Sequence, residues 1–187
     1  MKGKLTSYSD QELVNNLSGS KPEAEKAFKE LYDRYSSMVH AYCLRVLSDE
    51  EQAEDIFQEV FIKFYQNVKS DAAKTNIPGF LITIARNLCL NYKRDKRTMV
   101  PIENLEFMFP ESQNYEQKEL LDLITHSLEL VDDDFREAFV LREYSGLSYK
   151  EIAEVTNITL ANAKSRVFRA KQQIKTILKP YLKDLSV

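Results

Sequence analysis

Apolar side chains recur every three or four residues over long stretches of this 187-residue chain, and this spacing constrains the fold more than any other feature. One stripe follows Ser20, another covers residues 53–65, and a third begins near Pro78, a residue tolerated in a first helical turn, and ends near Tyr92. The first stripe contains Phe28, Leu31, Tyr32, Tyr35, Met38, Val39, Tyr42, Cys43 and Val46. Three long amphipathic helices can close one core. We therefore interpret these stripes as packing surfaces and not as a cofactor site.

Helix starts are marked by four Ser-x-x-Glu sequences, which begin at Ser9, Ser20, Ser48 and Ser148. In each, the hydroxyl and the carboxylate can satisfy N–H groups that the first helical turn leaves free. Only four Gly and five Pro are available for the tight turns that a many-stranded sheet protein needs. The sequence predicts an all-α protein.

Membrane and zinc proteins are disfavoured. No apolar run reaches the roughly 20 residues that span a bilayer, and residues 1–10 lack the apolar stretch of a signal peptide. We therefore expect a cytoplasmic chain with no membrane contact of its own. Cys43 and Cys89 are too far apart for a zinc cluster and lie in apolar stripes, which favours buried thiols.

Enzymatic motifs are absent from the sequence. His40 and His126 are isolated, and the chain has no Gly-rich phosphate loop. We expect the six acids of residues 49–61 to lie on the solvent side of one helix without a nearby Arg or His, where they form either a docking face or a solvated one. We expect no catalytic residue, no metal site and no cofactor.

Charge is sorted into blocks that the formal net charge of −3 conceals. Residues 86–97 hold five bases against one acid, and residues 164–179 hold six bases and no acid. Residues 103–119 hold five acids against one base. Two separate cationic surfaces thus accompany an acidic segment, and a net negative charge does not exclude a nucleic-acid-binding protein.

A helix-turn-helix pattern occupies the C-terminal part of the chain, with helices expected at 148–155 and 160–178 around a turn at 156–159. Asn157 stands where the turn needs positive φ, and Thr159 is suited to cap the second helix. The expected inward stripe of that helix is Ala163, Val167, Ala170, Ile174 and Leu178.

The remaining faces of the second helix are chemically suited to the major groove of DNA. They carry Lys164, Ser165, Arg166, Phe168, Arg169 and Lys171. Arg can bond guanine bidentately, Lys and Ser can hold phosphates, and Phe168 can lie against a thymine methyl. A solvated basic face is the competing interpretation. We favour DNA binding because the basic residues lie on the second helix of a helix-turn-helix.

The other basic patch mixes cations with an amide and an aromatic ring, beside a polar loop at residues 67–76. Its members are Arg86, Asn87, Tyr92, Lys93, Arg94, Lys96 and Arg97. Such a surface can hold phosphates and accept an unstacked base, as in single-strand binding. The alternative is that these basic residues only complement the negative C-terminal end of a helix, which gives the same cluster of cations.

Periodicity lapses between residues 98 and 119, where Pro101, Pro110 and the acids lie. We expect two small helical domains, residues 1–97 and 120–187, joined by a flexible acidic linker at 98–119. Fully stretched, the linker reaches roughly 70 Å, enough to hold two DNA-binding bodies apart. A disordered hinge without that role has the same composition.

Ordered motifs in the chain resemble the extracytoplasmic-function (ECF) group of bacterial sigma-70 family RNA polymerase sigma factors. They are Asp-Ile-Phe-Gln-Glu-Val-Phe at 55–61, Ile-Ala-Arg-Asn-Leu at 84–88 with Tyr-Lys-Arg at 92–94, Arg-Glu-Ala-Phe-Val-Leu-Arg-Glu at 136–143, Gly-Leu-Ser-Tyr-Lys-Glu-Ile-Ala at 146–153, and Lys-Ser-Arg-Val-Phe-Arg-Ala-Lys at 164–171. The resemblance covers about residues 20–97 (region two) and 120–180 (region four).

The resemblance implies a protein that directs core polymerase to promoters and assists melting. It assigns binding of the largest-subunit clamp helices to Asp55, Gln58, Glu59 and Phe61. It assigns capture of the melted minus-ten strand to Lys69, Asn76, Arg86, Asn87, Tyr92, Lys93, Arg94 and Arg97. It assigns the duplex minus-thirty-five element to Lys164, Ser165, Arg166, Phe168, Arg169 and Lys171. It further implies the second-largest-subunit flap and an anti-sigma factor as partners.

Departures from the family pattern concern mainly region four. Val131-Asp132 stands where Leu-Pro is usual, and we expect Asp132 to cap the following helix. Asn157 replaces the usual glycine of the turn. The alternative functions are a stand-alone helix-turn-helix regulator that binds DNA as a dimer, and a helical adaptor with incidental basic surfaces.

Overall fold

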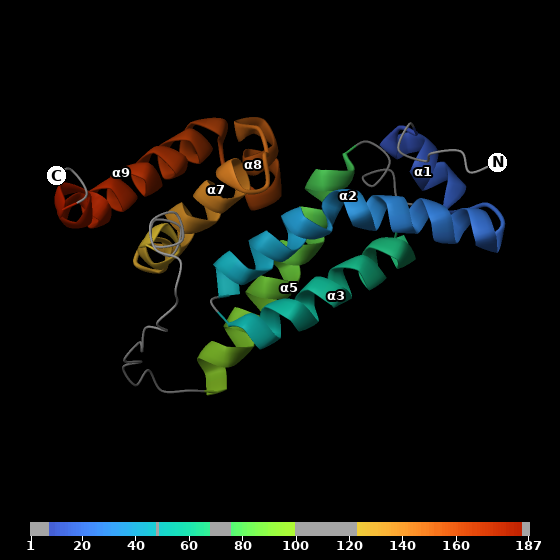
Figure 1. The fold of residues 1–187 in the computed structure, drawn as a ribbon, viewed down its shortest axis with the longest axis horizontal. Helices are drawn as coiled ribbons and strands as arrows, with labels where there is room; N and C mark the ends of the chain where they lie inside the picture. The colour runs from blue at the N-terminus through green and yellow to red at the C-terminus, as the bar shows by residue number, and fades with distance from the viewer. Residues whose placement is uncertain (1–7, 48, 68–75, 100–122, 185–187) are drawn as a thin grey trace.

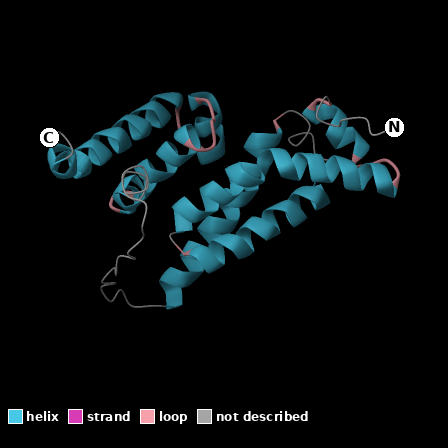
Figure 2. Cartoon of the chain, in the orientation of Figure 1, coloured by secondary structure: helices cyan, strands magenta, loops and turns pink. Residues whose placement is uncertain are grey.

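A computed structural model of the chain describes residues 8–47, 49–67, 76–99 and 123–184, and for residues 97–99 and 181–184 it describes the backbone alone. Its helices are α1 (Asp10–Asn16), α2 (Lys21–Leu47), α3 (Glu50–Asn67), α5 (Ile77–Met99), α7 (Asp133–Glu143), α8 (Tyr149–Thr156) and α9 (Leu160–Asp184), with a further helix at 123–129. The described part of the chain holds no strand (Figure 2), so the all-α prediction is confirmed.

Helices α2, α3 and α5 pack against one another and, with α1, form what we call the N-terminal bundle (Figure 1). The three apolar stripes meet in its core, where Val39, Phe64 and Leu81 are fully buried. Figure 1 shows α7, α8 and α9 grouped at the other end of the molecule. With the helix at 123–129 they form the C-terminal bundle.

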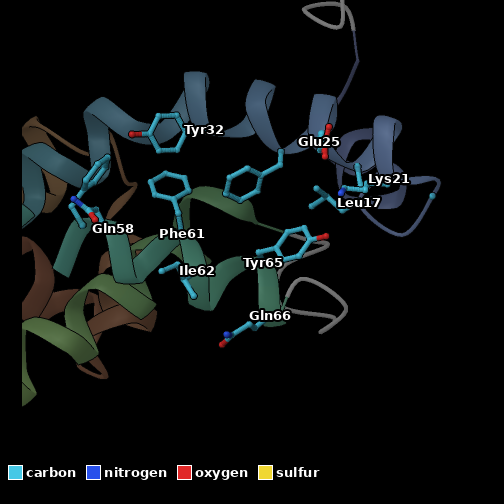
Figure 3. Close-up of a pocket in the computed structure, with 13 residues that line it drawn as sticks. Leu17, Lys21, Glu25, Tyr32, Gln58, Phe61, Ile62, Tyr65 and Gln66 are labelled. Carbon is cyan, nitrogen blue, oxygen red and sulfur yellow. The ribbon is translucent and has the colours of Figure 1, made fainter. Parts of the chain in front are cut away.

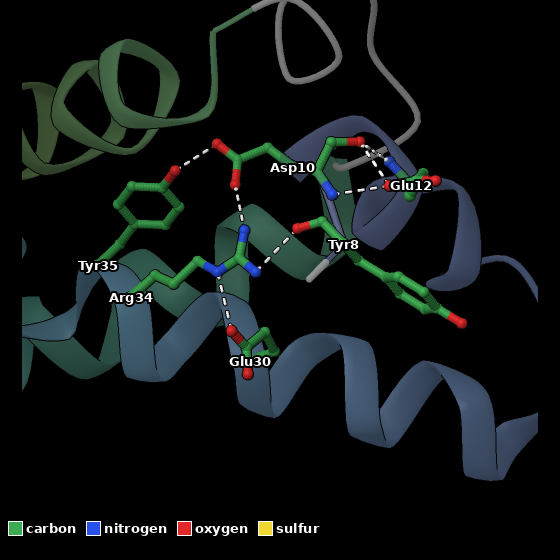
Figure 4. A network of polar contacts seen from close by, with 7 residues as sticks. Tyr8, Asp10, Glu12, Glu30, Arg34 and Tyr35 are labelled. Carbon is green, nitrogen blue, oxygen red and sulfur yellow. Dashed lines mark hydrogen bonds and ion pairs between the residues drawn. The ribbon is translucent and has the colours of Figure 1, made fainter. Parts of the chain in front are cut away.

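Helix α1 is fixed to α2 by a polar network (Figure 4). The Arg34 guanidinium pairs with Asp10 of α1 at 2.9 Å and with Glu30 at 2.9 Å, and it also donates to the Tyr8 carbonyl. The Tyr35 hydroxyl donates to Asp10. Burial, followed by this bond, raises the pKa of Tyr35 above its ordinary value, so the phenol remains a neutral donor.

Capping chemistry sets the start of most helices. Ser9 and Ser148 form the predicted reciprocal capping boxes with Glu12 and Glu151. At α2, Glu23 accepts from the Ser20 N–H and hydroxyl.

Helix α3 begins at Glu50. Ser48 lies outside the described residues, and the cap is Asp49, whose carboxylate accepts from the Gln52 N–H at 3.2 Å. This bond is the largest influence that lowers the pKa of Asp49. An ionised Asp at this position also complements the positive helix N-terminus.

In the C-terminal bundle, α8 and α9 form the predicted helix-turn-helix. Asn157 has φ 55° and ψ 47°, the left-handed conformation expected for the turn. Thr159 accepts from the Asn162 N–H at 3.2 Å and so caps α9. The predicted inward stripe, Ala163, Val167, Ala170, Ile174 and Leu178, is buried throughout.

The start of α7 corrects one prediction. Asp132 occupies the N-cap position, but its side chain makes no capping hydrogen bond. Its carboxylate instead accepts from Gln173 Nε2 at 2.7 Å and so joins α7 to α9. The Asp132 carboxylate therefore accepts a hydrogen bond from Gln173 of α9 and not from the first turn of α7.

The two bundles touch, with α7 against α2 and α8 against α5. One apolar cluster runs across the contact and includes Val39 on one side and Val140 and Ile152 on the other. The Arg45 guanidinium lies 3.8 Å from the centroid of the Tyr144 ring. Residues 100–122, which hold most of the predicted linker, lie outside the described residues; the bundles are in direct contact and not separated by the reach of the linker.

Candidate nucleic-acid surfaces and an apolar groove

The outer face of α9 presents the predicted duplex-reading side chains. Lys164 and Arg169 are exposed, Ser165 is half-buried, and Phe168 is 62% exposed. The buried stripe opposite fixes the direction in which this face points. This face therefore presents two cations and an aromatic ring, groups that can contact phosphates and bases.

Several α9 cations also contact α7. Arg166 pairs with Asp134 at 2.6 Å, and Lys171 pairs with Glu143 at 2.8 Å. The Arg169 guanidinium lies 5.6 Å from the centroid of the Phe135 ring. Arg166 is half-buried, so α7 holds it in place, whereas Lys164 has no ionic partner among the described residues.

The candidate strand-binding residues lie along α5 and at its start, but they do not form one open face. Asn87 and Arg94 are exposed, and Arg94 pairs with Asp95. Tyr92 is half-buried and donates to Asp49 at 3.2 Å. Lys69 lies outside the described residues, and only the backbone of Arg97 is described.

Three members of this set contact the C-terminal bundle. Arg86 donates to both oxygens of Glu137, from Nε to Oε1 at 3.0 Å and from a terminal nitrogen to Oε2 at 3.3 Å. Lys93 pairs with Asp133 at 3.2 Å. At the start of α5, Asn76 Nδ2 donates to Glu151 Oε1 at 2.8 Å.

Glu137 is the centre of the contact. It is 8% exposed, and its Oε1 also accepts from the hydroxyl of Tyr42 at 2.9 Å. Tyr42 is fully buried, and burial, followed by the charge of Glu137, raises the pKa of Tyr42 well above its ordinary value. The phenol therefore stays protonated and donates.

An apolar groove of about 840 Å³ lies between α2, α3 and the end of α1 (Figure 3). Its lining includes Leu17, Ala24, Phe28, Tyr32, Phe57, Gln58, Phe61, Ile62 and Tyr65. Ile62 is 57% exposed and Tyr65 is 49% exposed. Phe28 contacts the Phe61 and Tyr65 rings edge-on, with centroids 6.3 and 5.6 Å apart.

The predicted polymerase-binding residues border this groove. Gln58 and Phe61 line it, with Phe61 buried at its base, and Asp55 and Glu59 are exposed on α3. The groove itself was not predicted, because Tyr32 and Tyr65 were assigned to core stripes. A signal was present: residues 61–65 hold four apolar side chains in five positions, more than one helical face can bury.

The acidic face of α3 has closer partners than the sequence indicated. Glu54 lies 3.2 Å from His40 Nε2, and Asp49 pairs with Lys96 of α5 at 3.3 Å. The expectation that no histidine lies near these acids is therefore wrong. His40 comes from the neighbouring helix α2, which the α3 sequence does not reveal.

The part of the chain that the structure describes contains neither a metal site nor a membrane-spanning helix. No group of three His, Cys, Asp or Glu side chains there could hold a metal ion. None of the helices described is both long and apolar enough to cross a membrane. Cys43 and Cys89 are free and buried, and their mutual hydrogen bond is the largest influence that raises the pKa of Cys89.

Comparisons with known proteins agree with the two bundles. The model for Sigma-70 region 2 matches residues 31–98, and the model for Sigma-70, region 4 matches residues 121–174. The RNA polymerase sigma-H factor of Pseudomonas aeruginosa is 30% identical over 96% of this chain and 99% of its own length. The ECF RNA polymerase sigma factor SigM of Bacillus subtilis is 31% identical over 79% of this chain and 93% of its own.

A solved structure shares the arrangement of helices. The sigma factor RpoE in a co-crystal structure with the anti-sigma factor NepR from Bartonella quintana has a TM-score of 0.69 at 26% identity, over 82% of this chain and 98% of that one. CnrH, solved with the cytosolic domain of CnrY, has a TM-score of 0.68 at 19% identity and supports the fold alone. Both sigma-70 regions in order, and full-length similarity to named sigma factors, show that this chain belongs to the ECF group of the sigma-70 family of RNA polymerase sigma factors.

Proposed function

We propose that this sigma factor recruits core RNA polymerase through the groove and acidic face of α3, reads the minus-thirty-five element with α9, and captures the melted minus-ten strand along α5. In this assignment region two is residues 1–97, the linker is 98–119, and region four is 120–187. The observation that carries the proposal is the outer face of α9, where Lys164, Phe168 and Arg169 are exposed on a helix fixed by a helix-turn-helix.

Duplex reading rests on the chemistry of that face. Arg169 can bond a guanine edge, Phe168 can contact a thymine methyl, and Lys164 can hold a phosphate. Arg166 and Lys171 already pair with α7, so their contribution is to position the helix as well as to add charge. A stand-alone regulator would use the same face but would need no polymerase.

Strand capture rests on the mixed surface of α5. Exposed Asn87 and Arg94, seven residues apart and so on one face of α5, offer an amide and a cation to an unpaired strand. Tyr92 is half-buried on another face, where it donates to Asp49. Preferential binding of the melted strand lowers the cost of unpairing and so assists opening of the duplex. The protein itself catalyses no reaction, because the polymerase performs synthesis, and it acts in the cytoplasm with the polymerase.

Polymerase recruitment rests on the groove. Its exposed apolar lining and its acidic border fit an amphipathic, basic-edged helix, such as those of the largest-subunit clamp. We assign binding of the flap of the second-largest polymerase subunit to region four. The fold shared with a sigma factor crystallised with an anti-sigma factor supports an inhibitor of that class as a further partner.

Run-off transcription with purified core polymerase and a promoter library tests the function. We expect promoter-dependent products only when the chain is present. Ile62→Asp should reduce binding to core by at least tenfold without unfolding the chain, because Ile62 is exposed at the groove. Leu130→Asp, the same kind of substitution at an exposed apolar residue distant in the sequence, serves as the control. Products that are identical without the chain would refute the proposal.

A further inference from the structure

The C-terminal half of α5 has two opposite faces with different surroundings. Tyr92 and Lys96 are one helical turn apart and share one face, while Asn87 and Arg94 are seven residues apart and share another. Position 94 lies about half a turn around the helix from positions 92 and 96, so the two faces point in opposite directions. The face of Asn87 and Arg94 is exposed, whereas both residues of the other face bond to Asp49.

Asp49 uses its two carboxylate oxygens on two different helices. Its Oδ1 accepts from the Gln52 N–H at 3.2 Å and caps α3. Its Oδ2 accepts from the Tyr92 hydroxyl at 3.2 Å and from Lys96 Nζ at 3.3 Å, both on α5. The Asp49 side chain is only 29% exposed. One carboxylate therefore joins the start of the helix that carries the groove to the end of the helix that carries the candidate strand-binding face.

The end of α5 needs such a bond because its sequence offers the core nothing to bury. Residues 93–97 are all charged, so Tyr92 is the last side chain before them that packs against the apolar cluster. The bond from Lys96 fixes α5 to the N-terminal bundle one turn farther along. This bond is also the largest influence that raises the pKa of Lys96, so the ammonium group stays charged.

We infer that Asp49 is a positioning residue for strand capture, which fixes the Tyr92–Lys96 face of α5 to the start of α3 and so directs Asn87 and Arg94 outward. The inference rests on the proposed function of α5. It gives Tyr92 an indirect role, because the hydroxyl acts through Asp49 and the ring packs against the apolar cluster. Tyr92 is then no stacking surface for an unpaired base.

The sign of one substitution separates positioning from charge. Asp49→Ser keeps a hydroxyl that can cap α3 and removes the acceptor that reaches Tyr92 and Lys96. Loss of a carboxylate by itself should strengthen binding of a polyanion. We expect the opposite: the holoenzyme should bind a labelled single strand, with the minus-ten sequence of a promoter it transcribes, about threefold to tenfold more weakly.

Glu50→Gln is the matched control, because it removes an exposed carboxylate next to Asp49 and leaves the bonds to α5 in place. This variant should not bind the strand more weakly than the wild type. Strand affinity of Asp49→Ser that equals or exceeds that of the wild type would overturn the inference, and so would an equal loss in Glu50→Gln.

A double-mutant cycle tests the role of Tyr92. Tyr92→Phe keeps the ring and removes the hydroxyl, so it should weaken strand binding in the wild type. In Asp49→Ser the hydroxyl has already lost its acceptor, and Tyr92→Phe should then cause no further loss. Equal losses in the two backgrounds would show that Tyr92 contacts the strand itself and would overturn the inference.

Binding to core polymerase distinguishes positioning of α5 from damage to the whole bundle. The groove is lined by α3 residues from Phe57 onward, away from Asp49, so core affinity of Asp49→Ser should change by less than about twofold. A parallel loss of core binding would contradict the positioning role. If thermal unfolding shows that Asp49→Ser does not fold, Asp49→Asn decides, since it keeps an acceptor for Gln52 and Tyr92 and removes the charge that pairs with Lys96. Weaker strand binding is again expected, and unchanged or tighter binding overturns the inference.

Failure of the proposed function gives a different result. In that case the wild-type holoenzyme neither binds the strand nor yields promoter-dependent transcripts. Failure of the inference leaves both activities of the wild type intact and changes only the behaviour of the Asp49 and Tyr92 variants.

Discussion

The outer face of α9 and the candidate face of α5 carry similar side chains in different surroundings. On α9, Lys164 and Phe168 are exposed, and the cations that pair do so with α7 of the same bundle. On α5, Arg86 and Lys93 pair with carboxylates of the other bundle. One cationic surface is therefore complete within its own bundle, whereas the availability of the other depends on how the bundles are arranged.

A basic patch in a sequence therefore does not specify an open surface. The distinction follows from where the nearest carboxylates lie, and those of α7 and α8 come to α5 only through tertiary packing. Four predictions test the comparison between α9 and α5.

The largest effect is expected on the open surface. Lys164→Ala combined with Arg169→Ala should weaken binding of the holoenzyme to the upstream promoter element by a few kcal/mol, at about 1–3 kcal/mol for each good base contact. Footprinting and equilibrium binding measure this loss of affinity. The matched control is Lys175→Ala with Lys179→Ala, exposed cations farther along α9. An unchanged footprint of the first variant would contradict the assignment of α9.

The contact between the bundles is tested by removing one hydroxyl. Tyr42→Phe deletes the donor to Glu137, and Tyr35→Phe deletes a comparable donor to Asp10 inside the N-terminal bundle. Each should lower the free energy of unfolding by about 1.5–3 kcal/mol, the range for hydrogen bonds to charged groups. Only Tyr42→Phe should reduce carbodiimide crosslinking of Lys93 to Asp133, which pair at 3.2 Å across the contact between the bundles. Equal crosslinking in both variants would separate Tyr42 from the docking contact.

The turn that aims α9 is expected to contribute about 1 kcal/mol. Asn157→Ala places a residue without a local hydrogen-bonding side chain at φ 55° and should destabilise the C-terminal bundle by about 1 kcal/mol. Asn157→Gly should cost less, because glycine adopts this conformation freely. Denaturant unfolding measures both. A larger loss for Gly than for Ala would show that the left-handed backbone is not the reason for Asn157.

The smallest effect concerns acid. Hydrogen bonds from Ser148, and then from Asn76, hold the pKa of Glu151 below its ordinary value of 4.5 in the folded chain. The unfolded chain then binds the proton more readily, so this contribution is complete above about pH 4.5 and is lost as pH falls through the lower folded-state pKa. Because Glu151 is partly exposed, we expect less than about 1 kcal/mol. Glu151→Gln should remove this part of the acid dependence, and pH-dependent unfolding curves that coincide for both proteins would contradict it.

The helices, the helix-turn-helix and the inward stripe of α9 could be predicted from the amino-acid sequence. These features depend on neighbours three or four residues apart, so the periodicity and the caps at Ser9 and Ser148 are sufficient to define them. Where an oxygen had a competing partner from another helix, as Asp132 has in Gln173, the local pattern failed. The outward side chains of α9, which we assign to DNA binding, followed from the same local geometry.

Which candidate surfaces are open depends on contacts between helices that are distant in the sequence. Arg86 and Glu137 are 51 residues apart in the sequence, Lys93 and Asp133 are 40 apart, and Asn76 and Glu151 are 75 apart. The sequence shows the sign of each charged side chain, but no periodic pattern identifies a partner so far away along the chain. The groove between α2 and α3 likewise arises where two stripes, each wider than one core can bury, meet side by side.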